Sequence, residues 1–165
     1  MSDDQIPSLA RRFLDGCTQR GIMAATAESC TGGLIIAALT DIAGSSSVVD
    51  RGFVTYSNEA KMEMIGVSPD TLAAHGAVSR QTALEMAAGA LERSRADIAL
   101  SVTGIAGPGG GSVDKPVGLV WFGVARTGYE PTAESRSFDN HGREFIRKEA
   151  VATALELGIG ALSRK

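Results

Sequence analysis

Several residue types are scarce in this chain of 165 residues. It has eight aromatic residues (five Phe, two Tyr and one Trp), two cysteines and two histidines. Cys17 and Cys30 do not form a CxxC pair, and two histidines are too few for the ligand spacing of a zinc site. The sequence therefore predicts neither a disulfide framework nor a metal site.

An excess of one charge and long apolar stretches are also missing. Sixteen Lys and Arg against 19 Asp and Glu give a net charge of −3, with no basic block to attract nucleic acid. The longest apolar run, Leu34 to Leu39, has six residues, whereas spanning a bilayer takes about 18. The start, Met1 to Asp4, is acidic and unlike a signal peptide. We therefore expect a cytoplasmic protein that binds neither nucleic acid nor a membrane.

Glycine, by contrast, is abundant. The chain has 20 glycines, about 12% where roughly 7% is usual. Five lie between Gly104 and Gly111 and two more at Gly32 and Gly33, so the excess is local and indicates two turns where the backbone approaches a ligand. The length, 165 residues, predicts a single domain, residues 1–165.

Helical and strand patterns alternate along the chain. Helices are expected at 5–20, after Gly33, at 58–65, at 79–94 with Ser79 as N-cap, and at 143–162. Strands are expected at 22–27, 48–56, 98–103, 117–126 and 134–138. This order predicts a three-layer α/β/α sandwich with a mostly parallel sheet. Because the last two strands are adjacent in sequence, we expect them to pair as an antiparallel hairpin in a mixed sheet.

Three unusual segments follow predicted strands, where open α/β sheets gather their ligands. They are 28–33, 56–61 and 103–112. Ser29 lies between a strand and a glycine-led helix, so its hydroxyl can be presented beside main-chain N–H groups that bind an anion. The same pattern also fits Ser29 or Thr31 as a simple helix cap.

A serine nucleophile needs a base, and Lys61 is placed to supply one if burial removes its proton. From spacing alone, the favoured interpretation of Lys61 is an exposed helix position near Glu59 and Glu63. A Ser/His pair with His75 or His141 has no support beyond the presence of these residues. Cys30 is best interpreted as a small buried residue, and Tyr56 alone reads equally as a packing residue.

The glycine-rich loop at 104–112 has neither the GxGxxG spacing of a Rossmann fold nor the Lys-Ser/Thr ending of a P-loop. Its main-chain amides could cradle a phosphate or a carboxamide, with Arg143 and Arg147 as counter-charges. A flexible surface loop explains the same residues equally well.

Three stretches together resemble the CinA carboxy-terminal domain family, and the likeness extends over about residues 6–162. They are AESCTGG (27–33), GFVTYSNEAK (52–61) and SVTGIAGP (101–108). The resemblance implies an amidohydrolase that converts nicotinamide mononucleotide to nicotinate mononucleotide and ammonia in pyridine nucleotide (NAD) salvage. It also implies a homo-oligomer, and neither a metal nor an organic cofactor.

Carried over by motif, the resemblance implies Ser29 as nucleophile, Lys61 as its lysine and Tyr56 as an assisting tyrosine. We hypothesise that Ser29 attacks the carboxamide after passing its proton to Lys61, directly or through Tyr56. Glu28 is expected either to face the cationic pyridinium ring or, equally, to supply polarity to the capping region of the next helix, and Arg143 is expected to clamp the phosphate. The residues expected to bind substrate are Glu28, Thr31, Gly32, Gly33, Asn58, Thr103, Gly104, Gly107 and Arg143.

Two other classes of function stay open at this point. The glycine loops would also suit a nucleotide-binding or regulatory module without catalysis. The competence and damage-response name of the family suggests a structural or assembly domain. The joint presence of Ser29, Tyr56 and Lys61 argues for the enzyme.

Overall fold

The computed structural model describes residues 2–164, which form one five-stranded sheet with helices on both faces. The strand order is β2-β1-β3-β4-β5. The inner strand β1 pairs in parallel with β2 and β3, whereas β3–β4 and β4–β5 are antiparallel. The strands are β1 (Ala24–Glu28), β2 (Val49–Val54), β3 (Ile98–Gly104), β4 (Leu119–Arg126) and β5 (Thr132–Ser137). The predicted mixed sheet with a final hairpin is therefore confirmed.

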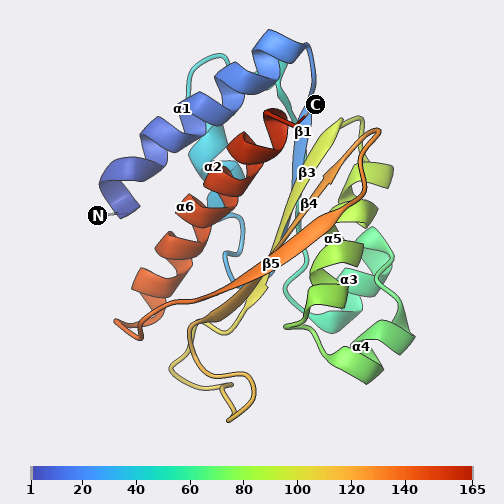
Figure 1. Ribbon diagram of the computed structural model, residues 1–165, viewed down its shortest axis with the longest axis vertical. Helices are drawn as coiled ribbons and strands as arrows, with labels where there is room; N and C mark the ends of the chain where they lie inside the picture. The colour runs from blue at the N-terminus through green and yellow to red at the C-terminus, as the bar shows by residue number, and fades with distance from the viewer. Residues whose placement is uncertain (1, 165) are drawn as a thin grey trace.

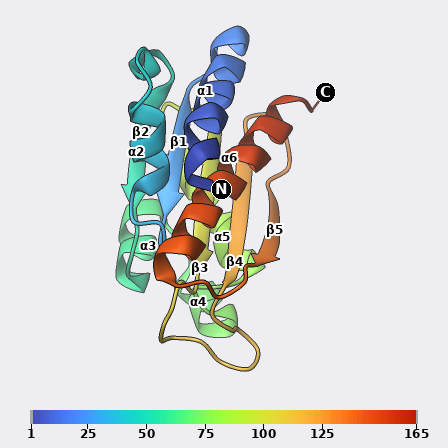
Figure 2. The ribbon, with the colours of Figure 1, turned by 90° about the vertical axis from the view of Figure 1, so that its left-hand side faces the viewer.

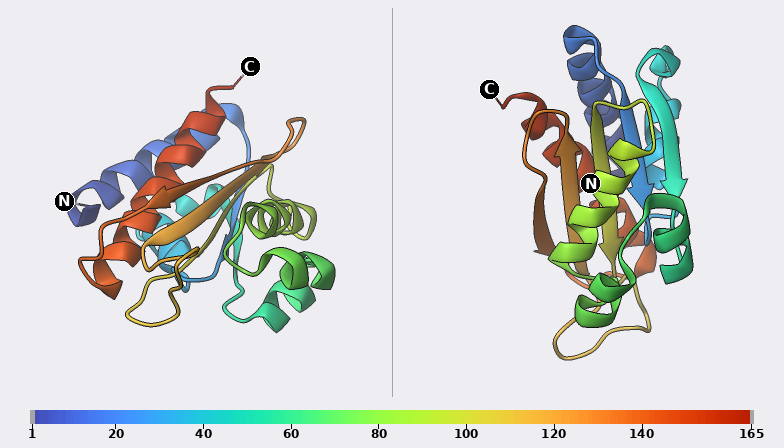
Figure 3. Two further views of the ribbon diagram at one scale, coloured as in Figure 1. Left: turned by 60° about the horizontal axis from the view of Figure 1, so that its bottom comes forward. Right: turned by 90° about the vertical axis from the view of Figure 1, so that its right-hand side faces the viewer.

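Each face of the sheet carries three helices (Figure 1). One face is covered by α1 (Ser2–Arg20), α2 (Leu34–Thr40) and α6 (Arg143–Leu162), which are in front in Figure 2. The other is covered by α3 (Asn58–Ile65), α4 (Pro69–His75) and α5 (Arg80–Glu92), in front in the right-hand view of Figure 3. A short 3-10 turn, η1 (Ser45–Ser47), precedes β2. The expected α/β/α sandwich is confirmed.

The central strands have small apolar side chains because both of their faces are covered. All of β1 is buried, as are the first six residues of β3. Two glycines allow α5 to pack closely: a Cβ at Gly89 would clash with the carbonyl of Ile65, and one at Gly123 with that of Ala83. Close approach of main chain therefore fills space at these positions in a sequence that has few aromatic side chains.

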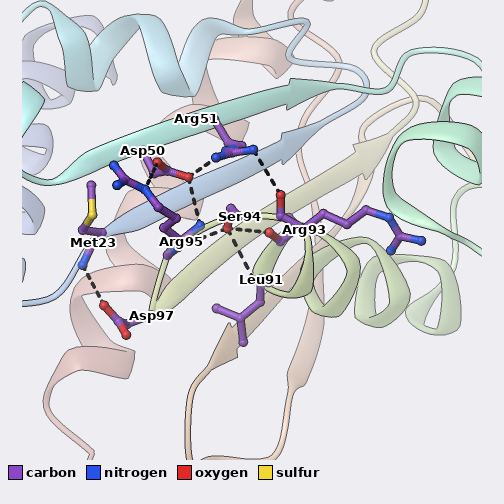
Figure 4. A network of polar contacts seen from close by, with 10 residues as sticks. Met23, Asp50, Arg51, Leu91, Arg93, Ser94, Arg95 and Asp97 are labelled. Carbon is purple, nitrogen blue, oxygen red and sulfur yellow. Dashed lines mark hydrogen bonds and ion pairs between the residues drawn. The ribbon is translucent and has the colours of Figure 1, made fainter.

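Polar contacts fix the edge of the sheet where the parallel strands begin (Figure 4). Asp50 accepts hydrogen bonds from Arg51 Nε at 2.7 Å and from the main-chain N and Nε of Arg95 at 3.0 and 3.2 Å. The main-chain N–H of Arg95 is the largest cause that lowers the pKa of Asp50. Nearby, Met23 N donates to Asp97 Oδ2 at 3.0 Å. These structural contacts occupy the edge where the parallel strands begin, and the opposite edge, where they end, is the place to look for a site.

Most predicted helices lie where expected, and the strands differ in length for local reasons. Ser79 is the N-cap of α5 and accepts from Thr82 N. The strand expected at 48–56 ends at Val54 because the chain turns there toward α3. The strand expected from 117 starts at Leu119 because Gly118, with φ +100°, turns the chain first. None of the helices within 2–164 has the length and apolarity needed to cross a bilayer.

Candidate active site

A cavity of about 250 Å³ lies at the edge where the parallel strands end. The arrowheads of β1 and β2 reach this edge, the lower one in Figure 2. The end of β1 brings Ser29, the chain after β2 brings Lys61, and α6 brings Arg143. Of the predicted site residues, seven line it together: Ser29, Tyr56, Asn58, Lys61, Thr103, Gly104 and Arg143.

Ser29 and Lys61 are in direct contact. Lys61 Nζ lies 2.9 Å from Ser29 Oγ, 2.9 Å from the carbonyl oxygen of Thr55 and 3.3 Å from that of Tyr56. The two carbonyls can only accept, so a neutral amine gives both of its protons to them and turns its lone pair to the Ser29 hydroxyl. This is the arrangement of a nucleophile and its base.

Burial makes Lys61 a suitable base. Its side chain is 1% exposed, although its neighbours Glu59 and Glu63 are exposed as expected of a surface helix. Lys61 and Ile65, four residues apart, both point inward on the same face of α3. Burial lowers the pKa of Lys61, and no carboxylate of the described chain hydrogen bonds to its Nζ to oppose this.

The turn after Ser29 presents free main-chain donors. Gly32 N donates to Ser29 O at 3.0 Å, and φ values of +58° at Gly32 and +106° at Gly33 close the turn. Within residues 2–164, the N–H groups of Cys30 and Thr31 donate to no main-chain carbonyl. Cys30 lines the cavity directly beside Ser29, and the N–H of Thr31 belongs to the peptide unit that begins at Cys30, so these two amides are suited to hold an oxyanion.

Glu28 does not face the cavity, contrary to the expectation that it contacts the pyridinium ring. Its carboxylate is 1% exposed and accepts hydrogen bonds from Thr31 Oγ1 at 2.7 Å, Ile35 N at 2.9 Å, Ile36 N at 3.0 Å and Thr26 Oγ1 at 3.1 Å. It therefore caps the first turn of α2 and anchors that helix to β1. Thr31, Gly32 and Gly33 likewise shape this turn and are not part of the cavity wall.

Tyr56 and Arg143 meet at the rim. The Tyr56 residue is 61% exposed, and its hydroxyl accepts from Arg143 Nη2 at 3.1 Å. Arg143 Nη1 donates to the carbonyl of Gly107 at 2.8 Å, which is how Gly107 takes part in the site. The phenol is thus directed to Arg143, and only the Tyr56 carbonyl contacts Lys61. Proton transfer from Ser29 to Lys61 needs no intermediary.

Other candidate groups are less suited to catalysis. Cys30 is buried, which raises the pKa of its thiol to about 11 and keeps it protonated at neutral pH. His75 and His141 are absent from the cavity wall, so a Ser/His pair does not form in the described chain. Among residues 2–164 no group of three or more His, Cys, Asp or Glu side chains could hold a metal ion.

The glycine-rich loop contributes less than its composition suggests. Gly104 lines the cavity, and Thr103 Oγ1 donates to the carbonyl of Ala77 at 2.8 Å. Gly109, Gly110 and Gly111 line a separate hollow at the tip of the loop, which projects beyond the sheet in Figure 1. The amide cradle expected from the 104–112 loop therefore does not include these three glycines beside Ser29.

Some lining residues were not expected from the sequence. Ala77, Val78 and Ala106 complete the wall. Ala77 and Val78 lie in the connection between α4 and α5, and two small apolar residues there give no periodic or chemical signal. A long-range hydrogen bond from Thr103 Oγ1 to the Ala77 carbonyl brings this connection to the site.

Comparison with known proteins gives consistent matches. A family model described as the CinA C-terminal domain matches residues 6–162. Nicotinamide-nucleotide amidohydrolase PncC of Escherichia coli K12 is 50% identical over 156 residues, 94% of each chain. The protein of that name from Enterobacter agglomerans is 48% identical over 159 residues, 96% of each chain. The crystal structure of competence/damage inducible protein CihA from Agrobacterium tumefaciens superposes with a TM-score of 0.93 at 56% identity, covering 97% of this chain and 96% of that one.

Proposed function

The chain belongs to the CinA C-terminal domain family, and on that premise we propose that it hydrolyses the carboxamide of nicotinamide mononucleotide to nicotinate mononucleotide and ammonia, a step of pyridine nucleotide salvage. The 2.9 Å contact between Ser29 Oγ and the buried Lys61 Nζ carries the proposal, because it supplies the nucleophile and base that amide hydrolysis needs. The name of the PncC relatives supports the substrate class.

In the first half of the reaction, neutral Lys61 takes the proton of the Ser29 hydroxyl while Oγ bonds to the carboxamide carbon. The Cys30 and Thr31 amides hold the resulting oxyanion. As the C–N bond breaks, the Lys61 ammonium gives its proton to the leaving nitrogen, which departs as ammonia. Lys61 is neutral again, and the acyl group is an ester of Ser29.

Water completes the cycle. Lys61 takes a proton from the water molecule that attacks the ester carbon, and the tetrahedral intermediate is again held by the two amides. When the bond from carbon to Ser29 Oγ breaks, Lys61 returns that proton to Oγ. The product acid leaves, and both side chains recover their starting states. A protonated Lys61 cannot begin either half, so the reaction requires the lowered pKa of Lys61.

Charge in the cavity favours a nucleotide with a phosphate. With Lys61 neutral, Arg143 is the charged side chain in its wall, and no carboxylate from the described residues lines it. We assign Arg143 to the phosphate and the exposed Tyr56 ring to a stacking contact with the cationic pyridinium. Asn58 is assigned to the ribose or carboxamide by its polar side chain in the same wall.

We extend the proposal to the setting of the enzyme. The expected compartment is the cytoplasm, and the expected form is a homo-oligomer, which the family resemblance supports. Sedimentation of the purified chain measures the latter. Residues 1–165 are proposed to act as one amidohydrolase domain.

An ammonia-release assay with nicotinamide mononucleotide tests the function. Wild type should release ammonia, and Ser29→Ala should lower kcat by at least about 10³-fold while keeping its melting temperature. The control is Ser47→Ala, which changes an exposed serine in the η1 turn and should retain wild-type turnover. Ligand-dependent thermal stabilisation of wild type without ammonia release would instead favour the non-catalytic nucleotide-binding module.

A further inference from the structure

Arg147, on α6, holds the turn that follows Ser29 from outside the cavity. Its Nε donates to the carbonyl of Cys30 at 2.9 Å and its Nη2 to that of Thr31 at 3.2 Å. Arg147 is not part of the cavity wall, and no ion pair joins it to a carboxylate among the side chains that the structure describes. The guanidinium therefore directs its charge to two main-chain carbonyls.

These two carbonyls control the direction of the two free amides. In a trans peptide the C=O and the following N–H point in opposite directions, and no cis bond occurs in this turn. Because Arg147 holds the Cys30 carbonyl, the N–H of Thr31 in the same peptide unit points away from Arg147.

Arg147 is also linked to the Cys30 N–H, through two peptide units. Arg147 holds the Thr31 carbonyl, and Gly32 N in that unit donates to Ser29 O at 3.0 Å. Ser29 O shares its own peptide unit with the N–H of Cys30. The guanidinium, two peptide dipoles and the Cys30 N–H are therefore aligned head to tail, and hydrogen bonds in such a chain polarise one another.

The turn is built to admit the guanidinium. A Cβ at Gly32 would lie 3.3 Å from Arg147 Nη2, and the φ of Gly32 is +58°. A side chain there would strain the backbone and crowd the arginine at once. The glycine thus permits both the turn and its contact with Arg147.

From these contacts we infer that Arg147 is a positioning residue that orients and polarises the Cys30 and Thr31 amides as the oxyanion site. The inference rests on the proposed amidase function. Arg147 acts through the main chain and does not touch substrate, unlike Arg143, one turn earlier on the same helix, which lines the cavity.

The test compares two substrates of wild type and Arg147→Met, nicotinamide mononucleotide and its thiocarboxamide analogue, which both release ammonia. Sulfur is the weaker hydrogen-bond acceptor, so the analogue gains less from the amides. Removal of one oxyanion donor lowers kcat by about 10²–10³-fold. In Arg147→Met both amides are kept but lose their alignment, so kcat/KM for the carboxamide should fall by about 10- to 100-fold. The kcat/KM for the thiocarboxamide analogue should fall by a smaller factor. The ratio of kcat/KM for the carboxamide to that for the thiocarboxamide should therefore be lower in Arg147→Met than in wild type, with KM for the mononucleotide little changed.

Lys148→Met, at the next position on α6, is the matched control and should leave both substrates at wild-type rates. Arg147→Lys keeps the charge but cannot donate to both carbonyls at once, so its ratio of kcat/KM values should lie between those of wild type and Arg147→Met. If Arg147→Met does not fold, Arg147→Lys is compared with wild type instead. With an active wild type, unchanged kcat/KM or an equal loss on both substrates overturns the role of Arg147 alone. A wild type that releases no ammonia from the mononucleotide overturns the proposed function and this inference with it.

Discussion

Replacing Lys61 by methionine should abolish catalysis and make the protein more stable near neutral pH. Methionine has a similar length and no charge, so the change removes a buried amine to which no carboxylate of the described residues hydrogen bonds. A buried lysine can avoid the cost of an unpaired charge by releasing its proton on folding. With an unfolded pKa of 10.5, this release costs at most about 1.36 kcal/mol for each pH unit below 10.5, or about 5 kcal/mol at pH 7.

The substitution also loses hydrogen bonds. The Tyr56 carbonyl keeps a partner, because Ser29 Oγ lies 3.4 Å from it, but the Thr55 carbonyl loses Nζ. An unsatisfied buried carbonyl costs about 1–3 kcal/mol. The balance is a gain of at most about 2–4 kcal/mol at pH 7, which for a chain of this size corresponds to a Tm rise of at most about 4–16 °C.

The pH dependence of this gain identifies its cause. Since the folded pKa of Lys61 is lowered, the unfolded chain binds more protons than the native protein between that pKa and about 10.5, and wild-type stability rises with pH over this window. The variant has no titrating group at this position, so its excess free energy of unfolding over wild type should shrink between pH 7 and pH 10. Above pH 10.5 wild type should be the more stable protein. Urea denaturation of both proteins across this range measures the difference, with Lys148→Met, at a surface ion pair with Glu144, as control. A difference that is constant with pH would refute the reasoning.

Three further outcomes are expected. In wild type, kcat/KM for the mononucleotide should fall about tenfold per pH unit below the lowered pKa of Lys61, because the ammonium form cannot accept the Ser29 proton; a profile that rises toward acid would contradict this. Cys30→Ala should keep activity within a few-fold, and iodoacetamide should not inactivate wild type at pH 7, so loss of turnover in either experiment would return the thiol to consideration. Glu28→Gln places an amide donor against the donors of α2 and should cost about 2–4 kcal/mol in urea denaturation, whereas unchanged stability would remove its capping role.

The sequence was sufficient to predict the layers of the fold and the meeting of three strand ends, because alternating helix and strand patterns determine both. It could not determine the state of Lys61, since the exposed Glu59 and Glu63 beside it suggest a surface helix. Tertiary contacts with Ser29, after β1, and with Thr55 and Tyr56, after β2, bury this position.

Glu28 and the glycine loop show a second limit. An acidic residue next to a nucleophile suggests a ligand contact, but the direction of its side chain depends on the α2 amides that it caps. The glycines at 109–111 were counted with those of the site because they are close in sequence, whereas the loop carries them away from the cavity. The direction of a side chain or of a loop depends on tertiary contacts, which local spacing in the sequence does not show.

The hairpin of β4 and β5 offers a place to open the chain. β4 runs antiparallel to β3, so the turn after Arg126 lies at the edge where β3 begins, remote from the cavity. Gly128 in this turn has φ +87° and open space around it. A fluorescent label or an affinity peptide inserted there would be carried on the molecule without approaching the reacting atoms, so turnover could be followed on an immobilised or tracked enzyme.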